Sequence, residues 1–201
     1  MRTQWRRSAW TALLLGVLPY VAMRGSERPD GASVTPASVA PVDSLQVVRA
    51  FAQRFYRWYV PIANDSTLRY PAYYRVLSVR SAMISKDLAT ALRSDSTLSS
   101  SKAEHEGLTD DPFLQSQDPC ERYDVDSVYR VQREFRARIR PMCATNAWQT
   151  SKPTLAIRSE RGRLVIANVW YDPRGDLISE LCGYARVERV PLAKSPACAR
   201  R

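Results

Sequence analysis

Histidine is almost missing from this sequence, and cysteine pairs of the kind that bind zinc are missing altogether. His105 is the only histidine among 201 residues, and no two of the four cysteines form a C-x-x-C step. A zinc site needs several such ligands, and a Ser-His-Asp triad would have to use His105, which lies in a segment rich in Ser, Lys and Glu. We therefore expect neither a zinc site nor a histidine-based hydrolase.

The sequence also lacks an apolar run of the length that an ordinary transmembrane helix requires. Residues 11–23 carry no charge, but they are only 13 residues long, whereas a membrane-spanning helix needs about 20. Arginines precede this segment, which is the arrangement of a secretory signal. We predict a signal peptide or short N-terminal anchor over residues 1–24, without the nearby cysteine that lipid attachment would need.

Basic residues are abundant, yet they do not form blocks. The chain has 30 Lys and Arg against 20 Asp and Glu, for a formal net charge of +10. A nucleic-acid-binding arm would concentrate its basic residues in one segment. We expect no nucleic-acid partner, and membrane contact only through the N-terminal segment if it is not removed.

The four cysteines all lie in the part of the chain that would be exported. An even number of cysteines in an oxidising compartment predicts two disulfides, and four cysteines allow three pairings. The preferred pairing joins Cys120 to Cys143 across a strand hairpin, and Cys182 to Cys198 across the C-terminal segment. Together with the signal peptide, these cysteines predict a periplasmic or extracellular protein.

Residues 25–42 are rich in Ser, Pro, Ala and Gly and predict a disordered linker, because they cannot bury enough apolar surface to offset the entropy of ordering. A single domain is expected over residues 43–201. It begins with a helix that Asp43 would cap and that Pro61 would help to end. Apolar side chains recur along this helix at helical spacing: Leu45, Val48, Phe51, Phe55, Trp58, Tyr59 and Ile62. A broad apolar surface, most simply a sheet, must cover this stripe.

A second helix is expected to start after Ser85, which is a favoured N-cap residue, and to continue through a segment that contains several leucines. The segment before it, residues 72–84, gives no clear signal. Residues 109–119 predict turns and loop, because each Asp-Pro step disfavours the helical conformation of the residue before the proline.

Two alternating runs predict half-buried strands at residues 123–131 and 135–143. In the first strand the side chains expected to face inward are Tyr123, Val125, Tyr129 and Val131. In the second strand Phe135, Ala137 and Ile139 would face inward, and the outward side chains are Arg136, Arg138 and Arg140. A fold-back through residues 132–134 would place Tyr123 near Cys143 and Asp126 near Arg140.

Residues 154–172 predict a hairpin with Arg161-Gly162 as its turn, followed by an interior strand that is apolar on both faces. Residues 175–185 predict a short helix with Asp176 near its start, and a strand is considered around residues 186–192. Helices followed by antiparallel strands indicate an α+β fold. We expect a curved antiparallel sheet wrapped over the long N-terminal helix, as a cone or roll.

Several short motifs resemble an uncharacterised family of exported bacterial proteins. These motifs are FYRWYV in the first helix, DPFLQSQD in the loop, and LVIANVWYDPRGDLISEL in the last strand and closing helix. The family carries a domain of unknown function that is grouped with the nuclear-transport-factor-like, cystatin-like cone folds. The resemblance covers roughly residues 43–183, and it implies a fold and a compartment. It implies no activity, because the family has no assigned chemistry.

Asp118 is the candidate catalytic residue. It lies in the Gln-containing loop at the entrance to the first strand, where desolvation among Tyr123, Tyr129 and Trp58 would let its carboxyl act as an acid or base. In the structural alternative, Asp111 and Asp118 accept backbone N–H bonds within their own turns. We favour this alternative, because no nucleophile or second base accompanies the carboxylate.

The candidate binding residues are Arg136, Arg138, Arg140, Asp118 and Tyr123. Like charges on one strand face repel unless something anionic lies alongside. Asp124 and Asp126 on the neighbouring strand are the favoured source of that charge, and an acidic envelope protein or an envelope phosphate is the other.

These observations favour a non-enzymatic exported domain that binds a protein or small ligand in the cell envelope. The alternatives are a pocket enzyme that uses Asp118 as acid or base, and an immunity or inhibitor protein. The acidic residues between positions 110 and 126 match no calcium-binding loop. We therefore expect no metal and no cofactor.

Overall fold

The computed structural model describes residues 44–101, 108–144, 152–171 and 175–199. The chain divides into two compact units, Met1–Ser38 and Val39–Arg201, and every described residue belongs to the second. The predicted signal peptide or anchor, the predicted linker, Asp43 and His105 lie outside the described residues. In the part of the chain that is described, no helix is both long enough and apolar enough to cross a membrane.

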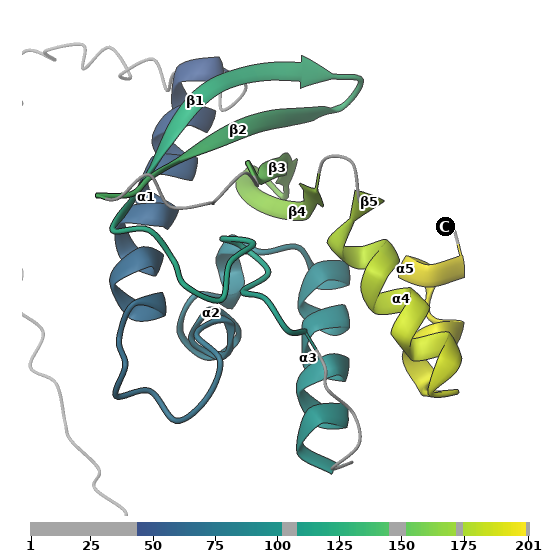
Figure 1. The fold of residues 1–201 in the computed structure, drawn as a ribbon. Coiled ribbons are helices and arrows are strands. Elements are labelled where there is room, and N and C mark those ends of the chain that lie inside the picture. The colour runs from purple at the N-terminus through teal and green to yellow at the C-terminus, as the bar shows by residue number, and fades with distance from the viewer. Residues whose placement is uncertain (1–43, 102–107, 145–151, 172–174, 200–201) are drawn as a thin grey trace, which may run out of the picture. The chain divides into compact units, whose positions relative to one another are not determined.

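The second unit is an α+β fold, as the sequence predicts (Figure 1). Five strands form one sheet in the order β1-β2-β3-β4-β5, and each strand runs antiparallel to the next. The strands are β1 (Arg122–Val131), β2 (Glu134–Met142), β3 (Thr154–Glu160), β4 (Arg163–Tyr171) and β5 (Gly175–Asp176). The helices are α1 (Leu45–Ala63), α2 (Tyr73–Val79), α3 (Lys86–Ser101), α4 (Leu177–Val187) and α5 (Pro196–Ala199), with short 3₁₀ turns at Ser81–Met83 and Pro191–Lys194.

Helix α1 begins one residue later than the sequence suggests. Ser44 is its N-cap, with an extended backbone and a side-chain oxygen that accepts the N–H of Val47 at 3.2 Å. A serine cap satisfies one of the unpaired N–H groups at a helix start, as an aspartate would. Pro61 lies inside the last turn instead of ending the helix, which continues to Ala63.

The apolar side of α1 carries most of the aromatic core. Its buried residues are Val48, Phe51, Ala52, Phe55, Tyr56, Tyr59 and Val60, whereas Leu45 at the helix start is 48% exposed. Phe55 stacks on Tyr59 with ring centroids 5.3 Å apart, and the ring of Phe113 packs edge-on against both. Tyr56 stacks on Tyr123 of β1 at 5.7 Å. The predicted aromatic stripe is therefore real, and it packs on β1 and on the loop before β1.

Polar side chains of α1 also pair with the backbone of β1, which is an edge strand of the sheet. The amide nitrogen of Gln53 donates to the carbonyl of Tyr123 at 3.1 Å, and the amide oxygen of Gln53 accepts the N–H of Val125 at 3.0 Å. Arg49 donates to the carbonyls of Val125 and Asp126. These bonds take the place of a neighbouring strand along the first half of β1, which protects that edge from pairing with another chain.

Replacing Gln53 with methionine tests this edge protection. The variant keeps the side-chain length but leaves two backbone groups of β1 without partners, so we expect a loss of about 1–2 kcal/mol in the free energy of unfolding and faster hydrogen exchange at the Val125 amide. Gln46→Met is the matched control, because Gln46 is exposed on the same helix. Equal urea midpoints for the two variants would show that the Gln53 bonds contribute nothing.

The β1–β2 hairpin forms where predicted, but the side chains of β1 that face the core change from odd-numbered to even-numbered positions along the strand. Arg122 pairs with Met142 and Asp124 with Arg140, and the register then shifts between Val125 and Ser127. One extra residue in a strand turns every later side chain to the other face. The prediction that Tyr129 and Val131 face inward is therefore wrong, since they are 43% and 41% exposed.

The predicted hairpin register was also displaced, because Tyr123 faces Pro141 instead of Cys143. Its two-residue turn uses Gln132, which adopts a positive φ of 53°. This conformation is uncommon outside glycine and asparagine, which explains why the turn had no signal in the sequence.

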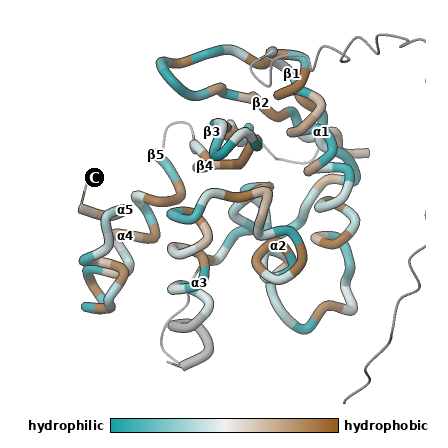
Figure 2. The backbone as a smooth tube through the Cα atoms, turned by 180° about the vertical axis from the view of Figure 1, so that it is seen from behind, coloured by the Kyte–Doolittle hydropathy of each residue, from teal (hydrophilic) through white to brown (hydrophobic). Residues whose placement is uncertain are grey.

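The β3–β4 hairpin confirms the sequence prediction more closely. Arg161 and Gly162 form its turn, both at positive φ, which suits the twist of a two-residue hairpin loop. Residues 164–169 of β4 are buried without alternation, and this strand is largely hydrophobic in Figure 2. An interior strand covered on both faces accounts for that pattern.

Helices α3 and α4 start at the N-cap residues that the sequence predicts. The Ser85 side chain accepts the N–H of Leu88 at 3.2 Å and starts α3, and Asp176 accepts the N–H of Ser179 and starts α4, as predicted. The ambiguous segment 72–84 forms α2 and a 3₁₀ turn. The strand considered around residues 186–192 is wrong, because α4 continues to Val187 and a second 3₁₀ turn follows it.

Both disulfides have the preferred pairing. Cys120 is bonded to Cys143, and Cys182 to Cys198. The first links the start of β1 to the end of β2, and the second joins α4 to α5, which holds the C-terminal segment against the domain. Two disulfides are compatible with an oxidising compartment.

Candidate functional site

One face of the β1–β2 hairpin gathers arginine and aromatic side chains. Residues paired directly across antiparallel strands share a face, and Arg136 pairs with Tyr129 of β1 while Arg138 pairs with Thr154 of β3. Thr154 in turn pairs with Trp170 of β4. We call this set the arginine face: Tyr129, Arg136, Arg138, Arg140 and Trp170. It lies opposite the face that carries Phe135, Ala137 and Ile139 into the core.

Arg136 and Trp170 form a cation–π contact on the arginine face. The guanidinium carbon of Arg136 lies 4.4 Å from the centroid of the Trp170 ring, and Arg136 also forms an ion pair with Glu134 at 3.3 Å. A guanidinium over an indole ring is a favourable cation–π arrangement. Trp170 is nevertheless 37% exposed, so part of this residue remains open to solvent.

The other two arginines of the face differ in how they are neutralised. Arg140 forms an ion pair with Asp126 at 3.7 Å, which confirms the expected contact although Asp124 is its direct partner in the ladder. Asp124 instead binds Arg122 at 3.1 Å. Among the described residues, Arg138 has no carboxylate oxygen within 4.0 Å, and its side chain is exposed. The internal acids therefore neutralise only part of the face.

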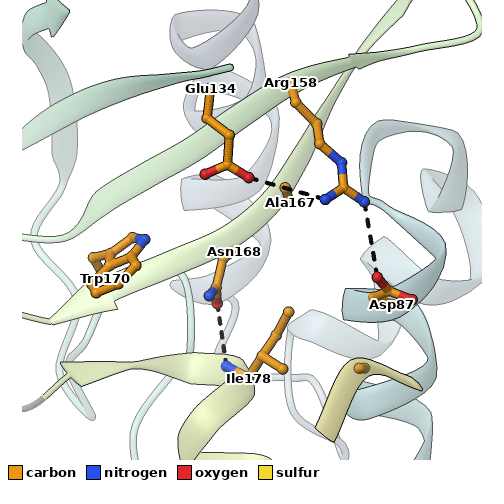
Figure 3. A pocket seen from close by; sticks show the side chains of 8 residues that line it. Asp87, Glu134, Arg158, Ala167, Asn168, Trp170 and Ile178 are labelled. Atoms are coloured by element: carbon orange, nitrogen blue, oxygen red, sulfur yellow. Dashed lines mark hydrogen bonds and ion pairs between the residues drawn. The ribbon is translucent and has the colours of Figure 1, made fainter. Parts of the chain in front are cut away.

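A pocket of about 400 Å³ adjoins the arginine face at Trp170 (Figure 3). Arg158 reaches into it from β3 and lies between Glu134 and Asp87 at 4.0 and 3.9 Å, and it binds Glu160 at 2.6 Å. Three carboxylates thus surround one guanidinium. The pocket is consequently a poor site for an anion, although its wall is continuous with the arginine face.

Asn168 at the floor of this pocket is structural. Its amide nitrogen donates to Asp176 at 2.6 Å, and its amide oxygen accepts the N–H groups of Val169 and Ile178. These bonds join β4 to the start of α4, as Figure 3 shows for Ile178. Sequence reasoning overlooked this residue, but one asparagine within the apolar run of β4 was a usable signal, because a buried amide requires partners.

The loop before β1 places its two aspartates in different surroundings. Asp118 is exposed, and its main-chain N–H and carbonyl bond the Ser116 hydroxyl. Asp111 accepts the N–H groups of Phe113 and Leu114, which confirms the predicted Asx turn at this position. The desolvation expected around Asp118 is found around Asp111.

Asp111 also accepts a hydrogen bond from the hydroxyl of Tyr59. Burial raises the pKa of Asp111 to about 6, while the bonds from Tyr59, Phe113 and Leu114 act in the opposite direction. A carboxyl with a shifted pKa beside a cavity is a candidate for function. Nothing in the sequence distinguishes Asp111 from Asp118, because both precede a proline in the same loop.

Tyr123, the remaining predicted binding residue, lies in the core. Its side chain is 1% exposed, and its hydroxyl accepts the N–H of Cys120 at 3.3 Å. Its ring stacks on Tyr56 and faces α1 instead of a binding surface. Within the described ranges, no group of three or more His, Cys, Asp or Glu residues is arranged to hold a metal ion.

Comparison of the chain with protein-family models, with curated proteins and with solved structures finds no match.

Proposed function

We propose that this protein is an exported binding domain that docks an acidic protein in the cell envelope through its arginine face. The observation that carries the proposal is the exposure of Tyr129, Trp170 and Arg138 together on one side of the sheet. The bulge in β1 creates this grouping, because it turns Tyr129 away from the core and onto the face of the arginines.

The chemistry of the face supports a protein partner. Tyr, Trp and Arg are the residues most enriched at the energetic centres of protein interfaces. The Arg136–Trp170 stack is already formed, so the entropy cost of ordering these two side chains on binding is reduced. Val131 and Met142, which are 41% and 37% exposed, extend the apolar surface at the two ends of the hairpin.

The charge of the face supports an acidic partner. Arg138 is exposed without a carboxylate nearby among the described residues, and Arg140 shares only a long ion pair with an exposed aspartate. A carboxylate-rich surface would complement both guanidinium groups and relieve their mutual repulsion. An immunity or inhibitor role would use the same surface, with an acidic toxin or enzyme as its partner.

We also propose that the sheet curves over α1 as a cone or roll, in line with the resemblance to cystatin-like folds. Support comes from the register shifts in β1 and β3, because bulges bend strands and increase their twist. Further support comes from β4, whose two faces are both covered. Secretion through an N-terminal signal remains part of the proposal, and the two disulfides support it.

The test begins with capture of partners by the full exported chain from the exported-protein fraction of the source cells. A captured protein is then purified, and its Kd is measured by calorimetry at low and high salt. We expect Arg138→Glu and Trp170→Ala each to weaken binding about tenfold or more, as loss of about 1.4 kcal/mol would do. Affinity should also fall with added salt, because the face is solvent-exposed and charged.

Arg69→Glu is the matched control, since Arg69 is exposed in the connection between α1 and α2 and has the same change of charge. Equal weakening by Arg138→Glu and Arg69→Glu would reduce the interaction to net charge and overturn the proposal. A second result would also overturn the proposal. It is that the chain binds vesicles containing anionic lipid, while no purified protein binds Arg138→Glu more weakly than Arg69→Glu. The face would then be assigned to the membrane surface.

A further inference from the structure

Two cavities adjoin along the loop that precedes β1, away from the arginine face. The larger one has a volume of about 430 Å³ and lies between the end of α1, the start of α2 and this loop. The smaller one has a volume of about 40 Å³. Both are lined by residues 108–111, so both cavities lie against this short segment.

The larger cavity is acidic although the chain as a whole is basic. Among the described residues, its charged lining residues are Asp65, Asp110 and Asp111, and neither lysine nor arginine belongs to that described lining. Tyr70 and Tyr73 also line this cavity. Carboxylates beside aromatic rings suit a cation, which gains from both the charges and the ring faces.

A buried amide in the smaller cavity points independently to a ligand. Gln115 is only 7% exposed, and its amide nitrogen has no hydrogen-bond partner among the described residues. A buried donor without a partner is costly, because it loses its hydrogen bonds to water and gains none in return. The backbone of Gln115 also has a positive φ of 54°, a conformation that is uncommon for a glutamine. Gln115 lines the smaller cavity beside Asp111, so an acceptor placed there would pair with its amide.

We propose that the two cavities form one site for a small organic cation that carries a carbonyl group, such as an amino-acid amide or the N-terminus of a peptide. The ammonium or guanidinium group would lie against Asp110 and Asp65, and the carbonyl would accept from the amide of Gln115. The volume of the larger cavity falls within the range of small-molecule sites.

The hydrogen bonds already present assign different roles to the acids of this site. Asp111 is fixed by Tyr59 and by two main-chain N–H groups, so it contributes a charge in a fixed position. One carboxylate oxygen of Asp65 accepts hydrogen bonds from the main-chain N–H and the hydroxyl of Thr67. Asp110 lines both cavities and is therefore the carboxylate through which one ligand could contact the two.

Three related probes separate the two features of the ligand. Argininamide carries two cationic groups and a carbonyl, agmatine carries two cationic groups without the carbonyl, and acetylnorleucinamide carries two carbonyls without charge. Binding is followed by ¹H–¹⁵N NMR on the full exported chain. We expect saturable shifts at residues 109–117 with argininamide, weaker binding of agmatine, and none of acetylnorleucinamide at the same millimolar concentrations.

Two variants assign the contacts. Asp110→Asn should weaken the binding of argininamide about tenfold. Asp118→Asn should leave the binding unchanged, because Asp118 lines neither cavity although it lies in the same loop. Gln115→Leu should remove the preference for argininamide over agmatine. If Gln115→Leu does not fold, the two aspartate variants still decide the question.

Two results would overturn the proposal. One is equal weakening by Asp110→Asn and Asp118→Asn, which would reduce the effect to net charge. The other is an absence of saturable shifts with every probe, together with a long-lived water detected beside Gln115, since that would identify the smaller cavity as the site of a structural water alone. Neither result bears on the arginine face, which lies on other elements of the chain.

Discussion

Phe55→Ala should remove about 3–5 kcal/mol from the free energy of unfolding, which is a large share of the roughly 5–15 kcal/mol of an ordinary domain. Phe55 is fully buried at the middle of α1. Its ring contacts Tyr59 and Phe113, with centroids 5.3 and 5.0 Å away, so its removal opens a cavity between α1 and the loop before β1. Rigid aromatic neighbours cannot collapse fully into that space, and the cavity therefore adds to the lost burial.

Urea unfolding with the disulfides intact measures this loss. Leu45→Ala is the control, because Leu45 begins the same helix and is 48% exposed, and its cost should stay near the ±0.5 kcal/mol of ordinary surface changes. Phe55→Leu leaves a smaller cavity, and its free energy of unfolding can be measured instead if Phe55→Ala does not fold. A cost below about 1 kcal/mol for Phe55→Ala would mean that the aromatic cluster does not hold α1 to the domain.

Elements with strong local signals could be predicted from the sequence. The Ser85 cap, the Arg161-Gly162 turn and the unbroken apolar run of β4 each depend on a few neighbouring residues, and each appears in the structure. The disulfide pairing was also predictable, because the hairpin brings Cys120 and Cys143 to the same end of two neighbouring strands. In these cases the local pattern determines the outcome.

The wrong predictions arise where a tertiary contact changes the structure that a correctly identified sequence pattern forms. Alternation in β1 is present as predicted, but the shift after Val125 reverses the face of Tyr129. No residue type marks that shift, because it depends on how β1 packs against both α1 and β2. The composition of the arginine face therefore could not be derived, although its three arginines could.

The two aspartates of the loop show the same limit for a site. Both stand before proline in one short segment, and it is the tertiary contact with Tyr59 that distinguishes the partly buried Asp111 from the exposed Asp118. Gln115 is a further example, since its burial and positive φ follow from the packing of the loop and not from its neighbours in the sequence.

Asp111→Asn should stabilise the protein at neutral and higher pH by up to about 3 kcal/mol, and by much less in acid. Burial raises the pKa of Asp111 in the folded protein to about 6 from the ordinary value of 3.8. Between these values the folded state binds the proton more tightly than the unfolded state, so stability falls as the pH rises. The stabilisation that comes from protonated Asp111 is complete below about pH 4 and is lost as the pH passes 6. A difference of about two units between the folded and unfolded pKa corresponds to about 3 kcal/mol.

The asparagine isolates this titration because it preserves the other contacts. Its amide oxygen can still accept from Phe113 and Leu114, and its amide nitrogen can donate to the oxygen of Tyr59. The facing hydroxyls of Tyr56 and Tyr59 stay protonated, because burial raises the pKa of both well above the ordinary value. Urea midpoints of wild type and Asp111→Asn from about pH 4 to 8 make the comparison, and Asp118→Asn is the control because it makes the same substitution at an exposed position of the same loop. If the Asp111→Asn curve also runs parallel to wild type, the carboxyl is not desolvated, and the loop would have to be more open to water than its bonds to α1 allow.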